Sequence, residues 1–153
     1  MTVSIQRAGP ADLDDLARLF DAYRRFYAQP SNPVRAREWL RERLRFGESV
    51  VLVARRHGGV AGFTQLYPMY SSVRMARTWI LNDLYVDPAS RRNGVGHALL
   101  EAATRFARDD GAAGISLETS RDNEAARALY RAAGWQEDAT QWYSLPLEAT
   151  SLQ

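Results

Sequence analysis

The sequence contains no cysteine and no lysine, and each absence narrows its chemistry. Without cysteine the chain forms no disulfide, no thiolate metal site and no thiol nucleophile, and we predict no metal site. Without lysine it offers no side-chain amine for a Schiff base, and all 20 basic residues are arginines. No apolar run approaches the roughly 20 residues that span a bilayer. The first residues also lack the apolar stretch of a secretory signal, so we expect a cytoplasmic protein without a membrane partner.

A length of 153 residues predicts one domain, 1–153, with one sizeable core. The net charge is only +2, but it is divided unevenly. Residues 1–77 hold 13 arginines against 7 acids, and residues 78–153 hold 7 arginines against 11 acids. The run of arginines between residues 35 and 45 is the one candidate for nucleic-acid binding, and Glu38 and Glu42 interrupt it. We therefore interpret these charges as solvated helix faces and expect no nucleic-acid partner.

Hydrophobic periodicity predicts alternating strands and helices along the whole chain. The predicted strands are 3–7, 49–55, 60–67, 78–86, 114–119 and a final pair within 135–147, around Gln141. The predicted helices are 10–27, 34–46, 94–110 and 122–133. His57-Gly58-Gly59 predicts a hairpin turn, and 68–76 is expected to be irregular. This order is typical of an α/β sheet with mixed strand directions rather than a doubly wound one.

A glycine turn joins the predicted strand 78–86 to the helix that follows it. Its sequence, Arg91-Arg92-Asn93-Gly94-Val95-Gly96, leaves little side chain near the start of the helix. Free N–H groups and the positive end of a helix favour an anion such as a diphosphate. A G-x-G turn alone is weak evidence, because a tight turn also needs glycine for a positive φ. It matches neither a dinucleotide-binding fingerprint nor a P-loop.

Two polar residues, Asn82 and Asp83, interrupt the apolar strand that leads into this turn. Because successive strand side chains point to opposite faces, one of the two is expected on a covered side of the sheet. There an unpaired polar group costs about 1–3 kcal/mol. A functional cleft explains that cost, and a hydrogen-bonded pair that supports a bulge is the alternative.

A third polar feature lies in the last predicted helix, where Asn123 and Tyr130 are seven residues apart. That spacing places them on one helix face, two turns apart. Capping of the helix by Asp122 or Asn123, and a core position for Tyr130, are the alternatives.

Taken together, Leu81–Leu100 and the Asn-x-x-Ala-x-x-Leu-Tyr-x-x-x-Gly-Trp motif of 123–135 resemble the GCN5-related N-acetyltransferase (GNAT) superfamily. The resemblance extends over essentially all 153 residues and is closest to polyamine and other small-amine acetyltransferases. It implies a single-domain α/β GNAT fold with about six to seven strands and about four helices. It also implies acetyl transfer from acetyl-CoA directly to a primary amine of a small molecule, polyamine-like or amino-acid-like.

The resemblance further implies which residues hold the cofactor. The diphosphate would lie on the glycine turn, the pantetheine arm would pair with 84–86, and a backbone N–H there would bind the thioester carbonyl. The implied cofactor-binding residues are Leu84, Tyr85, Val86, Arg91, Arg92, Asn93, Gly94, Val95, Gly96, His97, Asn123 and Tyr130.

For catalysis, the resemblance implies Tyr130 as the acid near the sulfur. Polyamine enzymes carry Glu where this chain has Asn82, which cannot accept a proton, so we expect Asp83 to be the base or the anchor of the amine. The substrate-binding candidates are Asn82, Asp83, Tyr27, Tyr67 and Trp79. The segments implied to form the acceptor pocket also bring in Tyr23, Trp39, Tyr70, Ser71 and Ser72, although core packing explains most of these aromatic residues equally well.

Other functions stay open at this point. The acceptor is alternatively a protein or histone lysine or an antibiotic, and a non-catalytic acyl-CoA sensor is a second class. The resemblance also favours a homodimer formed through the later strands.

Overall fold

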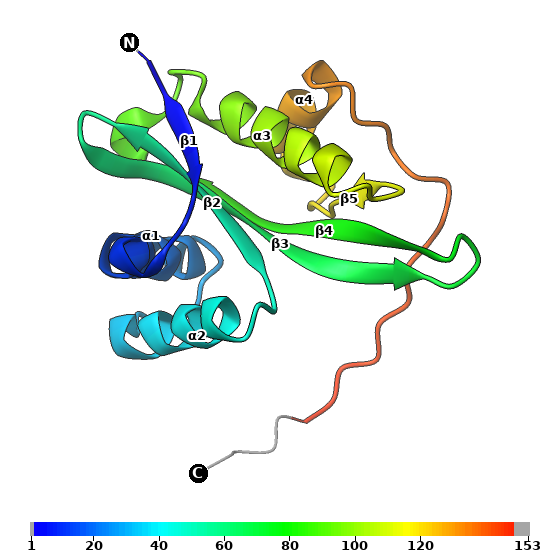
Figure 1. Ribbon diagram of the computed structural model, residues 1–153, viewed down its shortest axis with the longest axis horizontal. Helices are drawn as coiled ribbons and strands as arrows, with labels where there is room; N and C mark the ends of the chain where they lie inside the picture. The colour runs from blue at the N-terminus through cyan, green and yellow to red at the C-terminus, as the bar shows by residue number, and fades with distance from the viewer. Residues whose placement is uncertain (1, 149–153) are drawn as a thin grey trace.

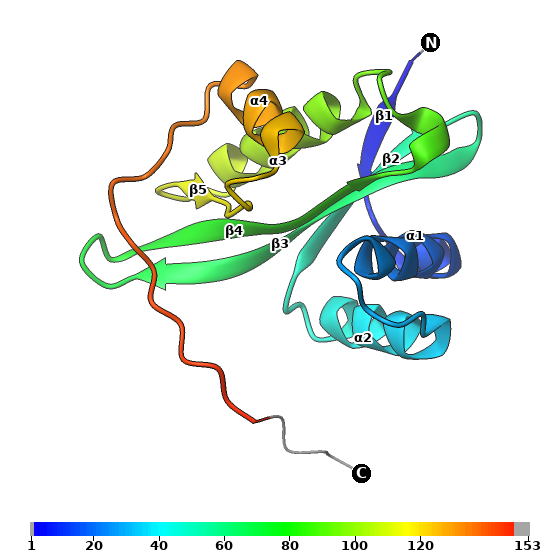
Figure 2. The ribbon, with the colours of Figure 1, turned by 180° about the vertical axis from the view of Figure 1, so that it is seen from behind.

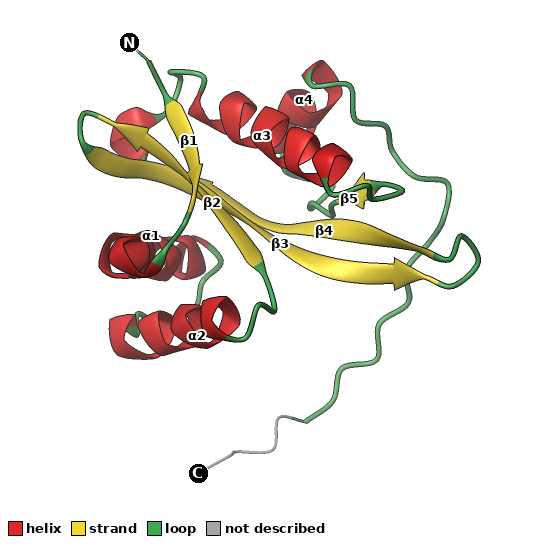
Figure 3. Ribbon diagram, in the orientation of Figure 1, coloured by secondary structure: helices red, strands yellow, loops and turns green. Residues whose placement is uncertain are grey.

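The structure, a computed structural model that describes residues 2–148, is a mixed sheet with helices on both faces (Figures 1 and 3). In chain order its elements are β1 (Ser4–Arg7), η1 (Pro10–Asp12), α1 (Leu13–Phe26), α2 (Pro33–Arg45), β2 (Val50–Arg56), β3 (Gly59–Ser71), β4 (Ala76–Val86), η2 (Pro88–Ser90), α3 (Val95–Asp109), β5 (Ile115–Ser116) and α4 (Glu124–Ala132). The strands lie in the order β1-β2-β3-β4-β5. Strands β1 to β4 are antiparallel, and β4 and β5 are parallel.

Helices α1 and α2 cover one face of the sheet, and α3 and α4 cover the other (Figure 2). Both faces of β2 are therefore buried: Val51 and Val53 pack in the core with α1 and α2, and Val50 and Leu52 pack in the core with α3. This explains why the strand is an unbroken apolar run in the sequence. Within residues 2–148, no helix has the length and apolar character needed to cross a membrane.

Local turn chemistry sets several of the boundaries. The predicted hairpin turn between β2 and β3 is confirmed, because His57 and Gly58 adopt φ values of 53° and 76°, as a type I′ turn requires. Helix α2 begins after Asn32, whose side chain accepts a hydrogen bond from the N–H of Arg35 at 3.2 Å. Gly47, with φ 63°, follows the end of α2 as predicted.

The β3–β4 hairpin is longer than the sequence predicts, and it projects beyond the rest of the sheet (Figure 1). The prediction that 68–76 is irregular is wrong for most of that segment, since β3 runs to Ser71 and β4 begins at Ala76. Pro68 does not end β3, because the pairing with β2 stops at Leu66 and an edge strand tolerates proline. Strand β5, in contrast, is shorter than the predicted 114–119.

The predicted final strand pair within 135–147 is also wrong. After α4 the chain is extended without strand pairing as far as residue 148, so the described residues form five strands rather than six or seven. Figure 1 shows this segment leading away from the sheet. Trp135 packs against the core, but Trp142, Tyr143, Leu145 and Leu147 find no sheet edge within the described chain and stay exposed, which is why periodicity and composition alone overestimated the strand content. The α/β class and the arrangement of four α-helices agree with the prediction.

Candidate active site

A β-bulge at Asn82 changes the direction in which β4 presents its side chains. In the β3–β4 ladder Asp83 pairs with Gln65 and Leu81 pairs with Leu66, so Asn82 is the extra residue on β4. Leu81 packs in the core on the α3 side, whereas Asp83 is buried beside a cavity on the α1 side. Without the extra residue, Leu81 and Asp83 would lie on the same face. Both features predicted for this polar pair are therefore present: Asp83 is buried on a covered side of the sheet beside a cavity, and Asn82 forms a bulge.

Two hydrogen bonds, one buried and one partly buried, fix the carboxylate of Asp83 on this face. The Nε2 of Gln65 donates to its Oδ2 at 2.7 Å, and the Nδ2 of Asn82 donates to its Oδ1 at 3.1 Å. Gln65 is in turn fixed by Ser49, whose Oγ donates to Oε1 at 2.8 Å. Gln65 and Ser49 were not predicted from the sequence. The adjacent polar residues Thr64 and Gln65 within an apolar strand are the same signal as Asn82 and Asp83, and they offered a way to find Gln65.

Burial raises the pKa of Asp83 above its usual value, and hydrogen bonds from Gln65, Tyr23 and Asn82 oppose that effect without cancelling it. The pKa values of Tyr23 and Tyr67 are also raised, first by burial and then by the charge of Asp83. Both phenols therefore stay protonated at neutral pH and face a carboxylate with more than ordinary proton affinity. A buried carboxylate with a raised pKa beside a cavity is typical of a general base.

A cavity of about 550 Å³ opens where β4 and β5 separate. These two strands pair only at Trp79 with Ile115 and at Ile80 with Ser116. Beyond that point the edge of β4 has no partner strand within the described residues, and its N–H and C=O groups face the cavity. Its lining comes from α1, β4, the glycine turn, α4 and the segment that follows β5. The predicted site residues in this lining are Tyr23, Tyr27, Asn82, Leu84, Tyr85, Val86, Arg91, Arg92, Gly94, Val95, Gly96, His97, Asn123 and Tyr130.

The glycine turn forms one end of this cavity. Arg92 and Gly94 adopt left-handed φ values of 62° and 75°, and Asn93 folds its side chain back, with Nδ2 donating to the carbonyl oxygens of Ser90 and Arg91. Across residues 2–148, no protein acceptor is present for the main-chain N–H groups of 92–97. These amides, at the positive end of α3, form the kind of concavity that binds a phosphate or diphosphate.

The side chains of Arg91 and His97 differ in their orientation. Arg91 lies along the cavity: its Nε donates to the carbonyl oxygen of Val86 at 3.1 Å, and its guanidinium lies 5.5 Å from the ring centre of Tyr85. The imidazole of His97 instead pairs with Glu101 at 3.1 Å. In the described structure, Arg91 therefore adds positive charge to the cavity wall, whereas His97 contributes through its backbone.

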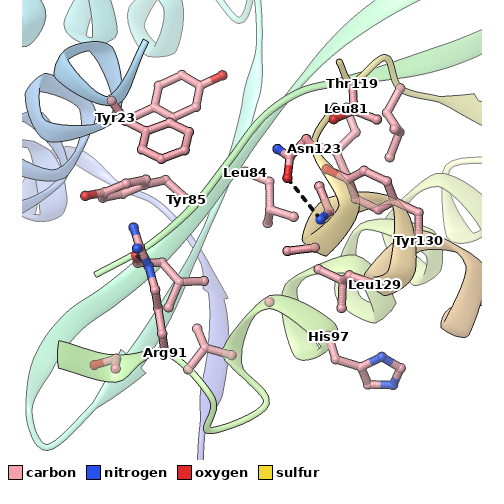
Figure 4. A pocket seen from close by; sticks show the side chains of 18 of the residues that line it. Tyr23, Leu81, Leu84, Tyr85, Arg91, His97, Thr119, Asn123, Leu129 and Tyr130 are labelled. Carbon is pink, nitrogen blue, oxygen red and sulfur yellow. Dashed lines mark hydrogen bonds between the residues drawn. The ribbon is translucent and has the colours of Figure 1, made fainter. Parts of the chain in front are cut away.

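Helix α4 forms the opposite wall, and Figure 4 shows Asn123 and Tyr130 across the cavity from Tyr23 and Tyr85. Asn123 caps the helix, with its side-chain oxygen accepting from the N–H of Ala126 at 3.2 Å, so the capping alternative is confirmed. Burial, followed by the nearby Tyr27, raises the pKa of Tyr130. This phenol therefore stays protonated and is available as a donor in the cavity.

A second cavity, of about 470 Å³, lies between β4 and helices α1 and α2. It is lined by Phe20, Tyr23, Arg24, Tyr27, Gln29, Arg35, Ala36, Trp39, Tyr67, Asn82 and Asp83. The two cavities share Tyr23, Tyr27 and Asn82, so they meet at the bulge. Asp83 belongs to the second cavity and Tyr130 to the first. Arg24 and Arg35 were not predicted, because no sequence pattern indicates which side of a helix borders a cavity.

Several residues predicted for the acceptor pocket lie elsewhere. Trp79 is buried on the α3 side of the sheet, where its ring packs on Phe106 and its Nε1 donates to Asp110 at 2.9 Å. Trp79 therefore does not belong to the candidate site, because it precedes the bulge and faces the same side of the sheet as Leu81. Three further residues of the predicted pocket, at the outer end of the β3–β4 hairpin, line neither cavity: Tyr70, Ser71 and Ser72. Asn93 supports the turn and does not line a cavity.

Comparison with known proteins gives a consistent result. Residues 15–135 match the model of the acetyltransferase (GNAT) family. The chain is 45% identical over 136 residues to the uncharacterized N-acetyltransferase YhfO of Bacillus subtilis (strain 168), covering 89% of this chain and 91% of YhfO. It is 32% identical over 93 residues to aminoglycoside N(6')-acetyltransferase type 1 of Klebsiella aerogenes, covering 60% and 61% of the two chains. A crystal structure of a probable acetyltransferase is 41% identical, with a TM-score of 0.91 over 96% of this chain and 99% of that one.

Proposed function

Because the chain belongs to the acetyltransferase (GNAT) family and is an acetyl-CoA-dependent N-acetyltransferase, we propose that it acetylates the primary amine of a small molecule by direct transfer. One observation supports this most strongly: a cavity with free backbone amides meets a second cavity with a buried carboxylate at the bulge of β4. A donor in the first cavity and an amine in the second would therefore face each other across Asn82.

The first cavity fits acetyl-CoA, the donor that this family generally uses. The amides of 92–97 and the guanidinium of Arg91 would hold the diphosphate, and the free edge of β4 at 84–86 would hydrogen-bond the amide groups of the pantetheine arm. Bound there, acetyl-CoA supplies an acetyl group activated as a thioester. The backbone N–H of Leu84 would stabilise the oxyanion that develops on the carbonyl, which is typically worth about 3–4 kcal/mol.

Asp83 would prepare the amine. An alkyl ammonium with a pKa of about 10.4 loses its proton at pH 7 at a cost of about 4.6 kcal/mol. The carboxylate of Asp83 attracts the ammonium and, directly or through a water, accepts its proton. Its raised pKa makes it a stronger base than an exposed aspartate. The proton thus ends on a side chain of the second cavity, next to the bulge where the two cavities meet.

Tyr130 would act on the leaving group. Transfer of a proton from a phenol of pKa about 10 to a thiolate of pKa about 8.5 costs about 2 kcal/mol. Burial raises the pKa of Tyr130 further, which makes complete transfer less favourable. The phenol therefore serves as a hydrogen-bond donor to the departing sulfur.

A thiol-release assay with Tyr130→Phe tests this assignment. Loss of the donor should lower kcat by about 10- to 100-fold, the value of one hydrogen bond to a developing charge, while the Kd for CoA stays unchanged. Tyr70→Phe is the matched control, because Tyr70 lies on the hairpin and lines neither cavity. Full turnover in Tyr130→Phe would overturn the role. Saturable CoA binding without thiol release on any amine would instead favour a sensor of acyl-CoA.

The proposal includes a homodimer. The extended segment after α4 leaves Trp142, Tyr143, Leu145 and Leu147 between 78% and 89% exposed, an unusual density of apolar surface for an isolated chain. The outer edge of β5 also lacks a partner strand within the described residues. A second copy of the chain would cover both features.

Sedimentation of the full chain tests the dimer. We expect twice the chain mass for the wild type and a shift toward the single-chain mass for Leu145→Asp, since a buried unpaired charge disfavours association. Val34→Asp, an exposed apolar position on α2, is the control and should keep the wild-type mass. A wild-type protein that sediments as one chain at every concentration would contradict the proposal.

A further inference from the structure

The second cavity carries an unequal set of charges. Within the described residues, its lining includes one carboxylate, Asp83, and two guanidinium groups, Arg24 and Arg35. Asp83 is on the buried side, with 5% of its surface exposed, whereas Arg24 is half-buried and Arg35 is exposed. A ligand in this cavity therefore meets negative charge at the bottom and positive charge toward solvent.

Neither of these two guanidinium groups forms an ion pair within the described residues. In the described part of the chain, neither Arg24 nor Arg35 lies within 4.0 Å of a carboxylate, whereas Arg25 pairs with Asp21 at 3.6 Å. Arg24 Nη1 donates to the carbonyl oxygen of Pro30 at 3.2 Å, which fixes its side chain at the α1–α2 connection.

Asp21, on the same helix as Arg24, is an acid on which the charge of Arg24 acts. Its carboxylate already accepts hydrogen bonds from Ser31 and from the N–H of Asn32, and it does not line the cavity. Burial raises the pKa of Asp21, but its hydrogen bonds and the charges of Arg25 and Arg24 outweigh that effect and lower the pKa. Arg24 therefore has a partial counter-charge, although no carboxylate of residues 2–148 pairs with it directly, and its guanidinium keeps N–H donors for a ligand.

Aromatic side chains form much of the wall of this cavity. Trp39 and Tyr27 line the cavity and are 44% and 55% exposed, and Tyr67 lines it nearer to Asp83. One face of Trp39 is covered by Arg43, 4.1 Å from the ring centre. Such walls suit a short aliphatic spacer, and a volume of about 470 Å³ suits a molecule the size of an amino acid or a dipeptide.

We propose that the acceptor is a small zwitterion, a primary amine that also carries a carboxylate, with the amine at Asp83 and the carboxylate at Arg24 and Arg35. The inference rests on the proposed function, since it names the acceptor of that same site. Guanidinium groups bind carboxylates through paired hydrogen bonds, and the single carboxylate of the cavity matches a single ammonium. One ammonium and one carboxylate thus fit the order of charges from floor to rim.

A polycation fits this cavity poorly. Each additional ammonium of a polyamine or an aminoglycoside would face Arg24 or Arg35 instead of a second acid, and like charges across a site act against binding. The chain is similar to an aminoglycoside acetyltransferase, but among the described residues this cavity lacks the additional acids expected in a site for polycations.

A panel of near-isosteric amines in the thiol-release assay tests the charge preference. For each chain length it would compare an ω-amino acid, its carboxamide and the corresponding diamine, for example 4-aminobutanoate, 4-aminobutanamide and 1,4-diaminobutane. Common α-amino acids with their amides, an aminoalkylphosphonate, spermidine and kanamycin complete the panel. We expect kcat/KM to fall about tenfold from the best carboxylate to its amide, and further to the diamine. The phosphonate distinguishes carboxylate recognition from recognition of any oxyanion.

Two substitutions locate the effect. Arg24→Gln and Arg35→Gln should each raise KM for the carboxylate acceptor about tenfold with little change in kcat, and they should leave the carboxamide acceptor unaffected. Arg24→Glu should reverse the preference toward the diamine. Arg41→Gln is the control, because Arg41 is an exposed arginine of α2 that lines neither cavity.

The outcomes separate the two levels of the proposal. Preference for a diamine, spermidine or kanamycin, or equal use of carboxylate and amide, would overturn the zwitterion while the acetyltransferase mechanism stands. Unchanged KM in both glutamine variants would do the same. Absence of thiol release with every amine, despite CoA binding, would overturn the proposed function itself.

Discussion

The two cavities that meet at Asn82 are built from different parts of the chain. The cavity on the α3 and α4 side depends on main-chain groups, the amides of 92–97 and the free edge of β4, with side chains in supporting roles. The cavity on the α1 and α2 side depends on side chains, namely Asp83 at its floor, two arginines at its rim and aromatic walls. The first arrangement suits a donor common to a whole family, and the second suits an acceptor particular to this protein. Substitutions should therefore separate the two functions.

The largest effect is expected for Asp83→Asn. Loss of the base should lower kcat/KM for the amine by about 10²–10⁴. The Kd for CoA, measured by calorimetry, should not change, because Asp83 does not line the cofactor cavity. Asp14→Asn, an exposed acid at the start of α1, is the control. An equal loss of CoA affinity would break the comparison between the cavities.

A smaller effect, in the other cavity, is expected for Gly94→Val. Its φ of 75° opposes a β-branched residue although the surrounding space is open, so the turn must strain or rearrange. We expect CoA to bind about tenfold more weakly, as loss of one or two hydrogen bonds from the turn would cause, with KM for the amine unchanged.

Gly58→Val is the matched control for that change. Gly58 has nearly the same φ, 76°, and equally open surroundings, but it lies in the β2–β3 hairpin away from both cavities. Both variants should lose about 1–3 kcal/mol of folding stability in thermal unfolding. If both also lose CoA affinity to the same extent, the turn at 94 has no specific role.

The smallest effect is a shift in pH dependence for Gln65→Leu. Asp83 accepts a proton only when ionised, so kcat/KM falls as the pH drops through its pKa, which burial raises. The hydrogen bond from Gln65 lowers that pKa, so its loss should move this limb to higher pH. Thr64→Val removes a buried hydrogen bond to the main chain of Asp83 and should leave the limb in place. The same limb should be absent from Asp83→Asn, and a limb that persists there belongs to another group.

The difference between the two cavities also explains which site residues could be predicted from the sequence. The glycine turn, the capping Asn123, the face of Tyr130 and the polar interruption at Asn82 and Asp83 depend on local spacing, and the structure places all of them around the two cavities. Which of the two polar residues is buried depends on a bulge, and the sequence offered the bulge only as an alternative. The bulge also explains why Trp79 was wrongly assigned to the acceptor pocket.

The remaining differences depend on tertiary contacts. Gln65 matters only because the β3–β4 register brings it opposite Asp83, and Arg24 and Arg35 matter only because the α1–α2 pair borders a cavity. The segment 135–147 has the apolar residues of a strand, but strand formation needs a neighbouring edge, and the described chain supplies none beside it. Local patterns therefore predicted the donor side of the site better than the acceptor side.

The central claim is that the amides of 92–97 grip the diphosphate of CoA while the acceptor binds on the other side of the bulge. Titration of the ¹⁵N-labelled protein with CoA, followed by amide NMR, tests it most directly. We expect saturable shifts that are largest at 92–97 and 84–86, and small at Arg24 and Arg35. Saturable binding that leaves the amides of 92–97 unshifted would contradict it.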